Sequence, residues 1–358
     1  MTSPAGPGNP VRYTVEQVEQ DLAREDLIRI WRDNLPVADS CDRKFAWTYE
    51  RAPTPPLSPV MLTARRGDER TVVGAAGVTR RVFIVDGEPA WAGLFADVAV
   101  DRNHRKALPA LALIRRAREA ARERAAFVYG SPNRKAEPVF VRAGYTRLGS
   151  LTRYVRVLRH AGYARRIVNL PLIAGAVGRV ADAGVFVRRV PDLVAATARY
   201  RLTFTDATDE RAAEVWEAAA PRYRIVGRRN AEFLRWRLAD YPYARHRFAW
   251  LEARGGGARA YAAVSEEDGD LAVRDFFGPP EMLPPLFEKL AVWARARGAR
   301  SIALRFLGDP RVVAALHASG FHARDHRRAI VIEAFESSTR YALLEPANWY
   351  LTDADEDI

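Results

Sequence analysis

The sequence has little of what disulfide-bonded, metal-binding or membrane-spanning proteins need. Cysteine occurs once in 358 residues, as Cys41, which excludes an internal disulfide and argues against a thiolate metal site. No apolar run reaches the roughly 20 residues that span a bilayer, and the N-terminal segment MTSPAGPGNP lacks the basic and apolar parts of a secretory signal. We therefore expect a cytoplasmic protein without a bound metal.

Several catalytic signatures are also missing. The sequence contains no Gly-x-x-x-x-Gly-Lys phosphate loop, no Gly-x-Ser-x-Gly elbow and no His-Glu-x-x-His pair. Nucleotide hydrolysis, serine hydrolysis and zinc catalysis therefore lack the groups that each of them requires. The function must rest on a different chemistry.

The positive charge of the sequence is large but spread out. The net charge is +12, and arginine contributes far more of it than lysine. Arginine suits phosphate, yet the basic residues are scattered over every expected helix and form no dedicated tail or stripe. An arginine-rich and alanine-rich composition is also typical of a high-GC genome. The pattern argues against nucleic acid as a partner and fits a smaller polyanionic ligand better.

The apolar patterns divide the chain into two similar halves. With 358 residues, 48% of them hydrophobic, the chain can form two compact units. In each half alternating strands are followed by a strand, a helix, a strand and a helix, so the expected fold class is α/β (α+β). The expected parts are a disordered N-terminus (1–10), a first domain (11–159), a helical linker (160–199), a second domain (200–335) and a C-terminal tail (336–358).

A few residues repeat between the halves at a nearly constant distance. Trp47 corresponds to Trp236, Asp97 to Asp275, and the pair Gly144-Tyr145 to Gly320-Phe321, with offsets between 176 and 189. Together with the shared order of elements, these offsets predict a duplicated domain.

The segment between the two halves has basic residues on either side of a short apolar stretch. From Arg165 to Arg189 it also contains Pro171 and several glycines, which weaken a long helix. Two interpretations stay open. The segment is either a linker packed between domains or a surface helix that contacts a membrane.

The residues that indicate a binding function follow the expected strand Leu94 to Val100. A helix begins a few residues later, so the backbone N–H groups of the connecting loop and first turn are unpaired and face outward. Such a terminus binds phosphate, and Arg105 and Lys106 add positive charge at the same end. After the strand FVYG comes Asn133, with Ala136, Phe140 and Gly144-Tyr145 at fixed distances behind it.

Together these features resemble the GNAT acyltransferase superfamily. Its pattern is a strand, an Arg-x-x-Gly-x-Gly/Ala loop, a helix, a strand and then Asn-x-x-Ala-x-x-x-Tyr-x-x-x-Gly-Phe. The resemblance covers the first half and implies two tandem GNAT-like domains, each a mixed, mostly antiparallel sheet flanked by helices. It implies acetyl-CoA or another acyl-CoA as cofactor, with pantetheine on the strand and pyrophosphate on the loop. The implied contacts are Val98, Val100, Arg105, Lys106, Ala107, Leu108, Ala110, Leu111, Asn133, Ala136 and Phe140.

Two positions depart from the family pattern. Leu108 replaces the first loop glycine and Pro109 follows it, which limits how closely the backbone can approach a phosphate. Pro109 would be tolerated in the first helical turn. Phe140 replaces the tyrosine that can protonate a leaving thiolate, so either another group supplies this proton or the activity is lost.

The candidate base is Asp97. Its apolar neighbours on the strand would desolvate the carboxylate and strengthen it as a base, although a structural carboxylate bonded to a neighbouring strand or arginine fits equally well.

The second half has prolines and an acidic residue after Asp275 where a phosphate loop would need amides and positive charge. We therefore expect it to bind no coenzyme and to complete an acceptor pocket.

The acceptor residues are expected in the second half and in the tail. The segment FLRWRLADYPYARHRF contains aromatic and basic side chains that could hold a polar acceptor, although such a cluster is also typical of a core. The tail NWYLTDADEDI is expected to be a docked strand with a solvated acidic tip, or alternatively to place carboxylates near a cationic acceptor. The candidates are Trp236, Arg237, Tyr241, Tyr243, Asp353 and Asp355.

The sequence thus predicts an N-acyltransferase that acts on a small-molecule amine or an amino sugar, by direct attack in a cleft between the domains. One alternative is a non-catalytic, coenzyme A-binding or scaffold protein. Another is an acyltransferase for a membrane-associated or carrier-borne substrate, in which the basic segment provides peripheral membrane contact.

Overall fold

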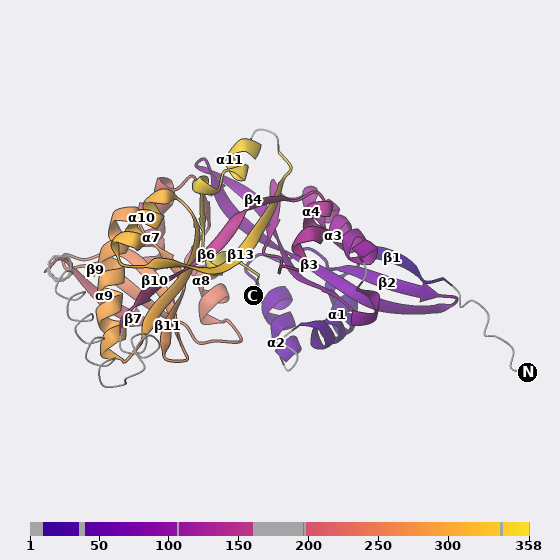
Figure 1. Cartoon of the computed structure of the whole chain (residues 1–358), viewed down its shortest axis with the longest axis horizontal. Coiled ribbons are helices and arrows are strands. Elements are labelled where there is room, and N and C mark those ends of the chain that lie inside the picture. The colour runs from indigo at the N-terminus through magenta and orange to yellow at the C-terminus, as the bar shows by residue number, and fades with distance from the viewer. Residues whose placement is uncertain are drawn as a thin grey trace, which may run out of the picture.

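The computed structural model describes residues 10–35, 40–105, 107–159, 196, 198–336 and 339–357. In these ranges the strands form a single sheet with the order β1-β2-β3-β4-β5-β13-β6-β12-β11-β10-β9-β7, and β14 and β8 join it to the side. Figure 1 shows the two ends of this order, with β1 and β2 on the right and β7 and β9 on the left. Most neighbouring strands are antiparallel. The predicted α/β class, with a mostly antiparallel sheet flanked by helices, is confirmed.

The first half contains six strands and their helices. They are β1 (Arg12–Gln17), α1 (Gln20–Asn34), α2 (Cys41–Phe45), the π-helical turn η2 (Ala46–Glu50), β2 (Val60–Arg66), β3 (Glu69–Val85), β4 (Glu88–Val100), η3 (Arg102–His104), α3 (Ala107–Arg122), β5 (Phe127–Gly130), α4 (Glu137–Arg142) and β6 (Thr146–Val157).

The second half repeats this order and then continues into the tail. Its elements are β7 (Tyr200–Thr205), α7 (Arg211–Ala219), η4 (Ala220–Arg222), β8 (Ile225–Gly227), α8 (Ala231–Leu234), the π-helical turn η5 (Arg235–Ala239), β9 (Arg247–Ala253), β10 (Ala258–Glu267), β11 (Asp270–Phe277), η6 (Pro280–Met282), α9 (Leu283–Ala296), β12 (Ser301–Gly308), α10 (Pro310–Ala318), β13 (His322–Ala334), α11 (Arg340–Leu344), η7 (Pro346–Asn348), β14 (Trp349–Leu351) and η8 (Asp353–Asp355).

The two halves exchange their last strands. β6 of the first half pairs with β12 of the second, where Ser301 faces Val157. β13 of the second half lies between β5 and β6, and its Val331 faces Gly130 of β5. Each half therefore completes its part of the sheet with a strand from the other half, so the two predicted domains share one sheet.

Apolar faces decide where the helices of the first half lie. In α1 the buried side chains include Leu27, Ile28 and Trp31, which keep helical spacing and pack with Met61 and Ala99 of the sheet. The buried side chains of α3 and α4 belong to a different cluster that also contains the apolar residues of β4 and β5. The helices α1 and α2 thus cover one face of the sheet, and α3 and α4 cover the other.

Some predicted parts fall outside the residues that the structure describes. These are nearly all of the predicted N-terminus (1–10) and linker (160–199), including the segment considered for membrane contact. Within the described ranges, no helix combines the length and the apolar character that crossing a membrane requires.

Candidate active site

The strands β4 and β5 separate after a short parallel pairing. They pair only where Ala92–Leu94 faces Phe127–Tyr129. From Phe95 to Val100, β4 has no strand beside it on that side in the described part of the chain. Its backbone N–H and C=O groups form a free edge, to which an extended ligand can bind as an added strand. Val98 and Val100, the predicted pantetheine contacts, both lie on this edge.

A bulge interrupts β4 at Asp97. The register of β3 against β4 shifts between Ala75 and Gly77, and Asp97 has φ 56°, a left-handed conformation that residues other than glycine seldom adopt. Bulges redirect a strand and often lie beside active sites. Here the backbone N–H of Asp97 donates to a carboxylate oxygen of Asp357, 2.9 Å away.

The loop before α3 is tied to β4. Arg105 donates through Nε to the carbonyl of Val100 (2.9 Å) and through a terminal nitrogen to Asn34 Oδ1 (2.8 Å). Pro109 lies in the first turn of α3, which is the tolerated position expected for it. Leu108 is 77% exposed at the same end. Arg105 thus fixes the loop that a pyrophosphate would approach.

The structure describes only some of the other predicted pyrophosphate contacts. Lys106 lies outside the described residues, and for Ala107 only the backbone is described. Ala110 and Leu111 are half-buried and pack against the apolar cluster beneath α3. These two side chains anchor the start of the helix and are not free to contact a ligand fully.

The segment that leads into α4 has a mainly structural geometry. Asn133 Oδ1 accepts hydrogen bonds from the backbone N–H groups of Lys135 and Ala136, both at 3.0 Å. Phe140 is buried and makes edge-to-face contacts with Phe95 (5.5 Å between ring centroids) and Tyr145 (5.2 Å). The residue that replaces the family's tyrosine therefore belongs to the core and offers no proton.

Asp97 is a member of a buried ion pair. Its Oδ1 lies 2.8 Å from Lys44 Nζ, and both side chains are almost fully buried. Burial alone would lower the pKa of Lys44, but the carboxylates of Asp97 and Asp357 raise it well above its usual range. Lys44 consequently stays protonated and compensates the charge of Asp97. Sequence patterns gave no sign of this partner, because Lys44 lies 53 residues before Asp97.

The carboxylate of Asp357 lies at the bulge as well. Burial raises its pKa to about 6, and repulsion from Asp97 adds to this effect. A carboxyl group that titrates near neutral pH is well matched to accept a proton from an amine during a reaction. Asp353 and Asp355 of the same tail were predicted as site residues, and Asp357 was not.

The acidic tail from Asp353 to Glu356 is buried among arginines between the two halves, where Figure 1 also shows the C-terminal end. Asp355 contacts Arg81 (3.0 Å) and Arg229 (2.6 Å). The predicted solvated tip is therefore wrong: a buried carboxylate is stable when a cation pairs with it, and the fold supplies these cations from distant parts of the chain. The arginines that bind the tail are Arg81, Arg229, Arg237, Arg274, Arg305 and Arg328.

Three predicted acceptor residues serve to hold this tail. Arg237 donates to the carbonyl oxygens of Ala354 (2.9 Å) and Glu356. Asp353 pairs with Arg274 and Arg305, and Asp355 with the two arginines named above. Their charged groups are already paired within the chain, which is not the arrangement expected of residues that bind an acceptor.

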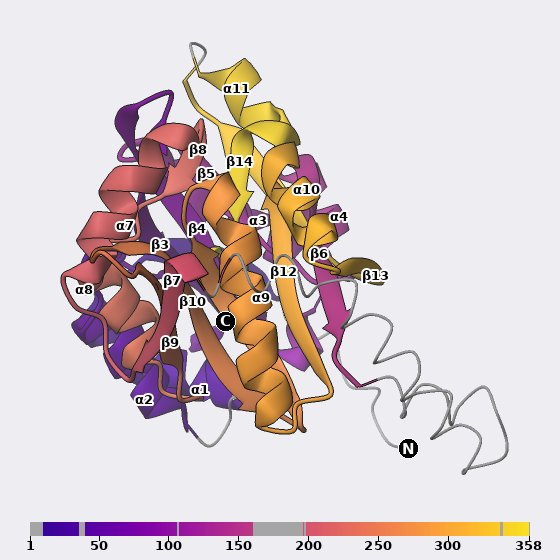
Figure 2. The same cartoon turned by 90° about the vertical axis from the view of Figure 1, so that its left-hand side faces the viewer.

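The tail also fills the groove of the second half that corresponds to the opening between β4 and β5. β11 pairs with β12 from Leu271 to Val273 only, and β14 then joins β12, with Tyr350 facing Gly308 (Figure 2). A Cβ on Gly308 would lie 1.7 Å from the carbonyl oxygen of Trp349, so this close approach requires glycine. The Tyr350 hydroxyl donates to the carbonyl of Phe276 at 2.5 Å.

The predicted aromatic cluster forms the contact between the halves. The rings of Trp47 and Trp236 stack with centroids 4.7 Å apart, and each indole N–H donates to the backbone carbonyl of the other tryptophan at 2.8 Å. Tyr241 contacts Trp47 edge-on and lies beside Tyr243. The two tryptophans that the sequence predicts to be equivalent thus contact each other, and Trp236 is a core residue.

Two cavities lie next to this contact. The smaller, of about 20 Å³, is lined by Lys44, Thr48, Asp97 and Asp357 among others, and it has room for about one water molecule. The Thr48 hydroxyl is buried there and, among the described residues, has no hydrogen-bond partner. The larger, of about 140 Å³, shares Thr79, Arg81 and Trp236 with it and opens between β3, β4 and α8.

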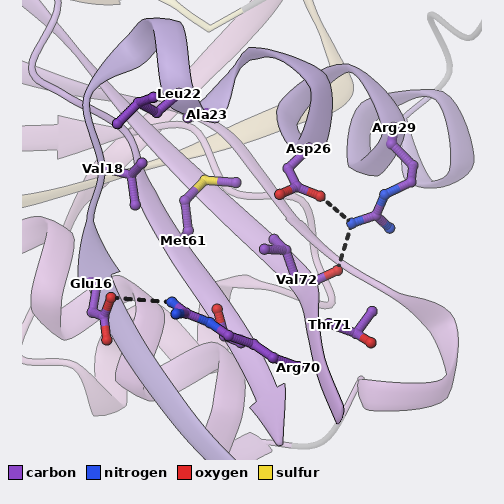
Figure 3. A pocket seen from close by; sticks show the side chains of 11 residues that line it. Glu16, Val18, Leu22, Ala23, Asp26, Arg29, Met61, Arg70, Thr71 and Val72 are labelled. Carbon is purple, nitrogen blue, oxygen red and sulfur yellow. Dashed lines mark hydrogen bonds and ion pairs between the residues drawn. The ribbon is translucent and has the colours of Figure 1, made fainter.

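A third and larger pocket, of about 580 Å³, lies between α1 and the strands β1 to β3 (Figure 3). Its charged side chains pair with each other: Glu16 with Arg70 at 3.4 Å, and Asp26 with Arg29 at 2.6 Å. None of the predicted site residues line it. Volume alone therefore does not identify the candidate active site.

Comparisons with known proteins identify the fold. No protein-family model matches the sequence, and no curated protein matches it. Solved structures do match. A GCN5-related N-acetyltransferase from Anabaena variabilis ATCC 29413 has a TM-score of 0.60 and 12% identity, over 91% of this chain and 73% of that chain.

Two further structures agree with this one. A GCN5-related N-acetyltransferase from Kribbella flavida has a TM-score of 0.55 and 15% identity, over 90% of this chain and 71% of that chain. The N-myristoyltransferase of Saccharomyces cerevisiae with bound myristoyl-CoA has a TM-score of 0.54 and 10% identity, over 92% and 84%. The protein therefore has the fold of the GNAT superfamily.

Proposed function

We propose that the protein is an acyltransferase that moves an acyl group, acetyl in the simplest case, from acyl-CoA to the amine of a small molecule. The observation that carries this proposal is the free edge of β4 beside the bulge at Asp97, with the carboxylate of Asp357 next to it. The free edge suits the pantetheine arm, and the carboxylate suits the amine that must lose a proton.

The residues present fit acyl-CoA. The edge from Phe95 to Val100 offers backbone groups to the amides of pantetheine, and the start of α3 offers its first amides to the pyrophosphate. Bound coenzyme supplies an activated thioester carbonyl. The backbone N–H groups of β4 near Asp97 can stabilise the oxyanion that develops on this carbonyl. For the Asp97 N–H, the Asp357 carboxylate must first move away.

The proposed reaction is a direct attack. The amine nitrogen forms a bond to the thioester carbon, the carbon–sulfur bond breaks, and Asp357 accepts the proton that the amine loses. Lys44 keeps the neighbouring Asp97 charge compensated throughout. Because Phe140 has no proton to give, the leaving thiolate takes its proton from solvent.

Calorimetric titration of the full chain with acetyl-CoA tests the first step. We expect the wild type to bind and Arg105→Glu to bind at least about tenfold more weakly, because the substitution breaks the tie to Val100 and places a negative charge near the pyrophosphate. Arg124→Glu, an exposed substitution just after the other end of α3, is the matched control. A wild type that fails to bind contradicts the proposal.

A second function, coenzyme binding without catalysis, is favoured by one observation. The carboxylate of Asp357 already accepts the hydrogen bond of the Asp97 N–H, and the cavity beside it has room for about one water molecule. Thioester consumption with a broad panel of amines separates the two functions. Background rates despite tight binding of acetyl-CoA would favour the non-catalytic protein.

A further inference from the structure

We propose that the acceptor carries an anionic group, a carboxylate or a phosphate, and that this group binds to Arg80 and Arg228 in the pocket beside Trp91. The inference rests on the acyltransferase function proposed above and names the class of its acceptor. The pocket has a volume of about 140 Å³, which suits one end of a small molecule.

The charges of this pocket differ from those of the rest of the site. Among the described residues, Arg80 and Arg228 form no ion pair, whereas Arg81 on the same strand is paired with Asp355 at 3.0 Å. Glu232 is the one carboxylate in the lining. With Arg81 compensated by Asp355, the pocket keeps an excess of positive charge, which attracts an anion and repels an acceptor that carries only amines.

Arg80 is held in position to bind. Its guanidinium lies over the ring of Trp91, with the central carbon 4.4 Å from the ring centroid, a stacking arrangement that keeps the planar donor group in place. Its Nε is buried and has no hydrogen-bond partner in the part of the chain that the structure describes. An oxygen of a carboxylate or phosphate would satisfy this donor and a terminal nitrogen together.

The pocket leads toward the reacting groups. Thr79, Arg81 and Trp236 separate it from the cavity at Asp97 and Asp357, and they line both spaces. These side chains must shift for an amine to pass, since the inner cavity holds about one water molecule. The acceptor would therefore bind with its anionic end at Arg80 and its amine directed inward.

The sheet sets the length of such an acceptor. Arg80 faces Gly93 across β3 and β4, and Gly93 precedes Asp97 by four residues, or roughly 13 Å of extended strand. The amine and the anionic group must therefore be separated by several bonds. An α-amino acid is too short, whereas an ω-amino acid or an amino sugar with a distant phosphate has suitable length.

Steady-state kinetics with acetyl-CoA and amines of matched length test the inference. We expect 6-aminohexanoate or 6-aminohexyl phosphate to have a kcat/KM at least about tenfold higher than hexylamine, and the two anionic probes distinguish carboxylate from phosphate. Arg80→Gln and Arg228→Gln should each raise KM for the preferred anionic amine about tenfold and leave hexylamine unchanged. Arg224→Gln, an exposed arginine outside the pocket, is the control.

Equal use of hexylamine and both anionic probes, with KM unchanged in both variants, would overturn the inference while the acyltransferase function stands. If no amine is acetylated at all, the proposed function fails, and calorimetric titration of the two anionic probes still decides on the pocket. Binding by the wild type that Arg80→Gln abolishes supports the anion site. Absence of binding by a wild type with a normal circular dichroism melt refutes it.

Discussion

The two openings in the sheet, between β4 and β5 and between β11 and β12, are alike in their strand pairing but differ in what occupies them. In each, a parallel pair of strands separates after three paired residues. In the second half β14 and the tail behind it enter the opening. In the first half the edge of β4 stays free, and only the tip of the same tail reaches the bulge at Asp97. The segment of β14 and the tail thus fills the opening between β11 and β12, and it places a carboxylate beside the opening between β4 and β5.

The buried aspartates at the two bulges show the same difference. Asp275 is bonded to Arg229, to the Tyr261 hydroxyl (2.6 Å) and to the Thr352 hydroxyl (2.6 Å), so its oxygens are fully occupied. Asp97 pairs with Lys44 and borders a cavity that contains the titratable Asp357. The closed groove is a structural ion-pair network, whereas the open one keeps a group that can change its charge.

The largest effect, on stability, is expected from removing a cation from the ion-pair network at the filled opening between β11 and β12. Arg229→Ala removes the cation shared by Asp275 and Asp355, whose side chains are at most 1% exposed. Asp275 would lose its cation and Asp355 would keep only Arg81, which should lower the free energy of unfolding by about 3–5 kcal/mol. Denaturant unfolding measures this change. Arg224→Ala removes an exposed pair with Asp86 and should have little effect; a similar loss in both variants would argue against the network.

A smaller effect, on activity, is expected at the open groove. Asp357→Asn keeps an oxygen for the Asp97 N–H but cannot accept a proton, so kcat/KM should fall about 100-fold. In the wild type kcat/KM should rise with pH through about 6, because burial raises the pKa of Asp357 to that value. This rise should disappear in the variant. An unchanged pH profile would show that Asp357 is not the base.

The same substitution should stabilise the protein. The pKa of Asp357 is raised from 3.8 to about 6, so the folded state binds a proton that the unfolded state releases, and stability falls as the pH rises across this range. At pH 8 Asp357→Asn should therefore be more stable than the wild type by about 2–3 kcal/mol. Below pH 4 the difference should vanish. Unfolding curves at both pH values check this, and a less stable variant at pH 8 would contradict it.

The smallest effect concerns a pair of equivalent aromatic residues. Tyr145 in the first half has a buried hydroxyl without a partner among the described residues, whereas Phe321, its counterpart, is a fully buried phenyl ring. Tyr145→Phe should raise the free energy of unfolding by up to about 1 kcal/mol. Phe321→Tyr is the reverse test and should lower it. A loss of stability in Tyr145→Phe would reveal a partner for the hydroxyl.

Much of the local structure was predictable from the sequence. The sequence predicted the strand Leu94 to Val100 and a helix that begins a few residues later, and in the structure β4 ends at Val100 and α3 spans Ala107–Arg122. The strand FVYG before Asn133 was also predicted, and it is β5. Patterns of this kind depend on neighbours a few residues apart, which the sequence shows directly.

The candidate site was only partly predictable. The motif around Val98, Arg105 and Asn133 has the expected arrangement of strand, loop and helix. The partners of Asp97 could not be foreseen, because Lys44 and Asp357 reach it from opposite ends of the chain. A run of acidic residues such as Asp353 to Asp357 is normally solvated, and nothing within the run indicates that arginines will surround it.

The sequence by itself determined the alternation of strands and helices and the presence of Phe140 where the GNAT pattern has a tyrosine, since each depends on residue types and short spacings. Only the tertiary structure decided which groove stays open. Strand exchange brings Val157 opposite Ser301, and burial of the tail depends on ion pairs such as Arg81 with Asp355, 274 residues apart. Such contacts become favourable only when the whole sheet has formed, because the cost of burying each charge is offset by a partner that the folded chain delivers.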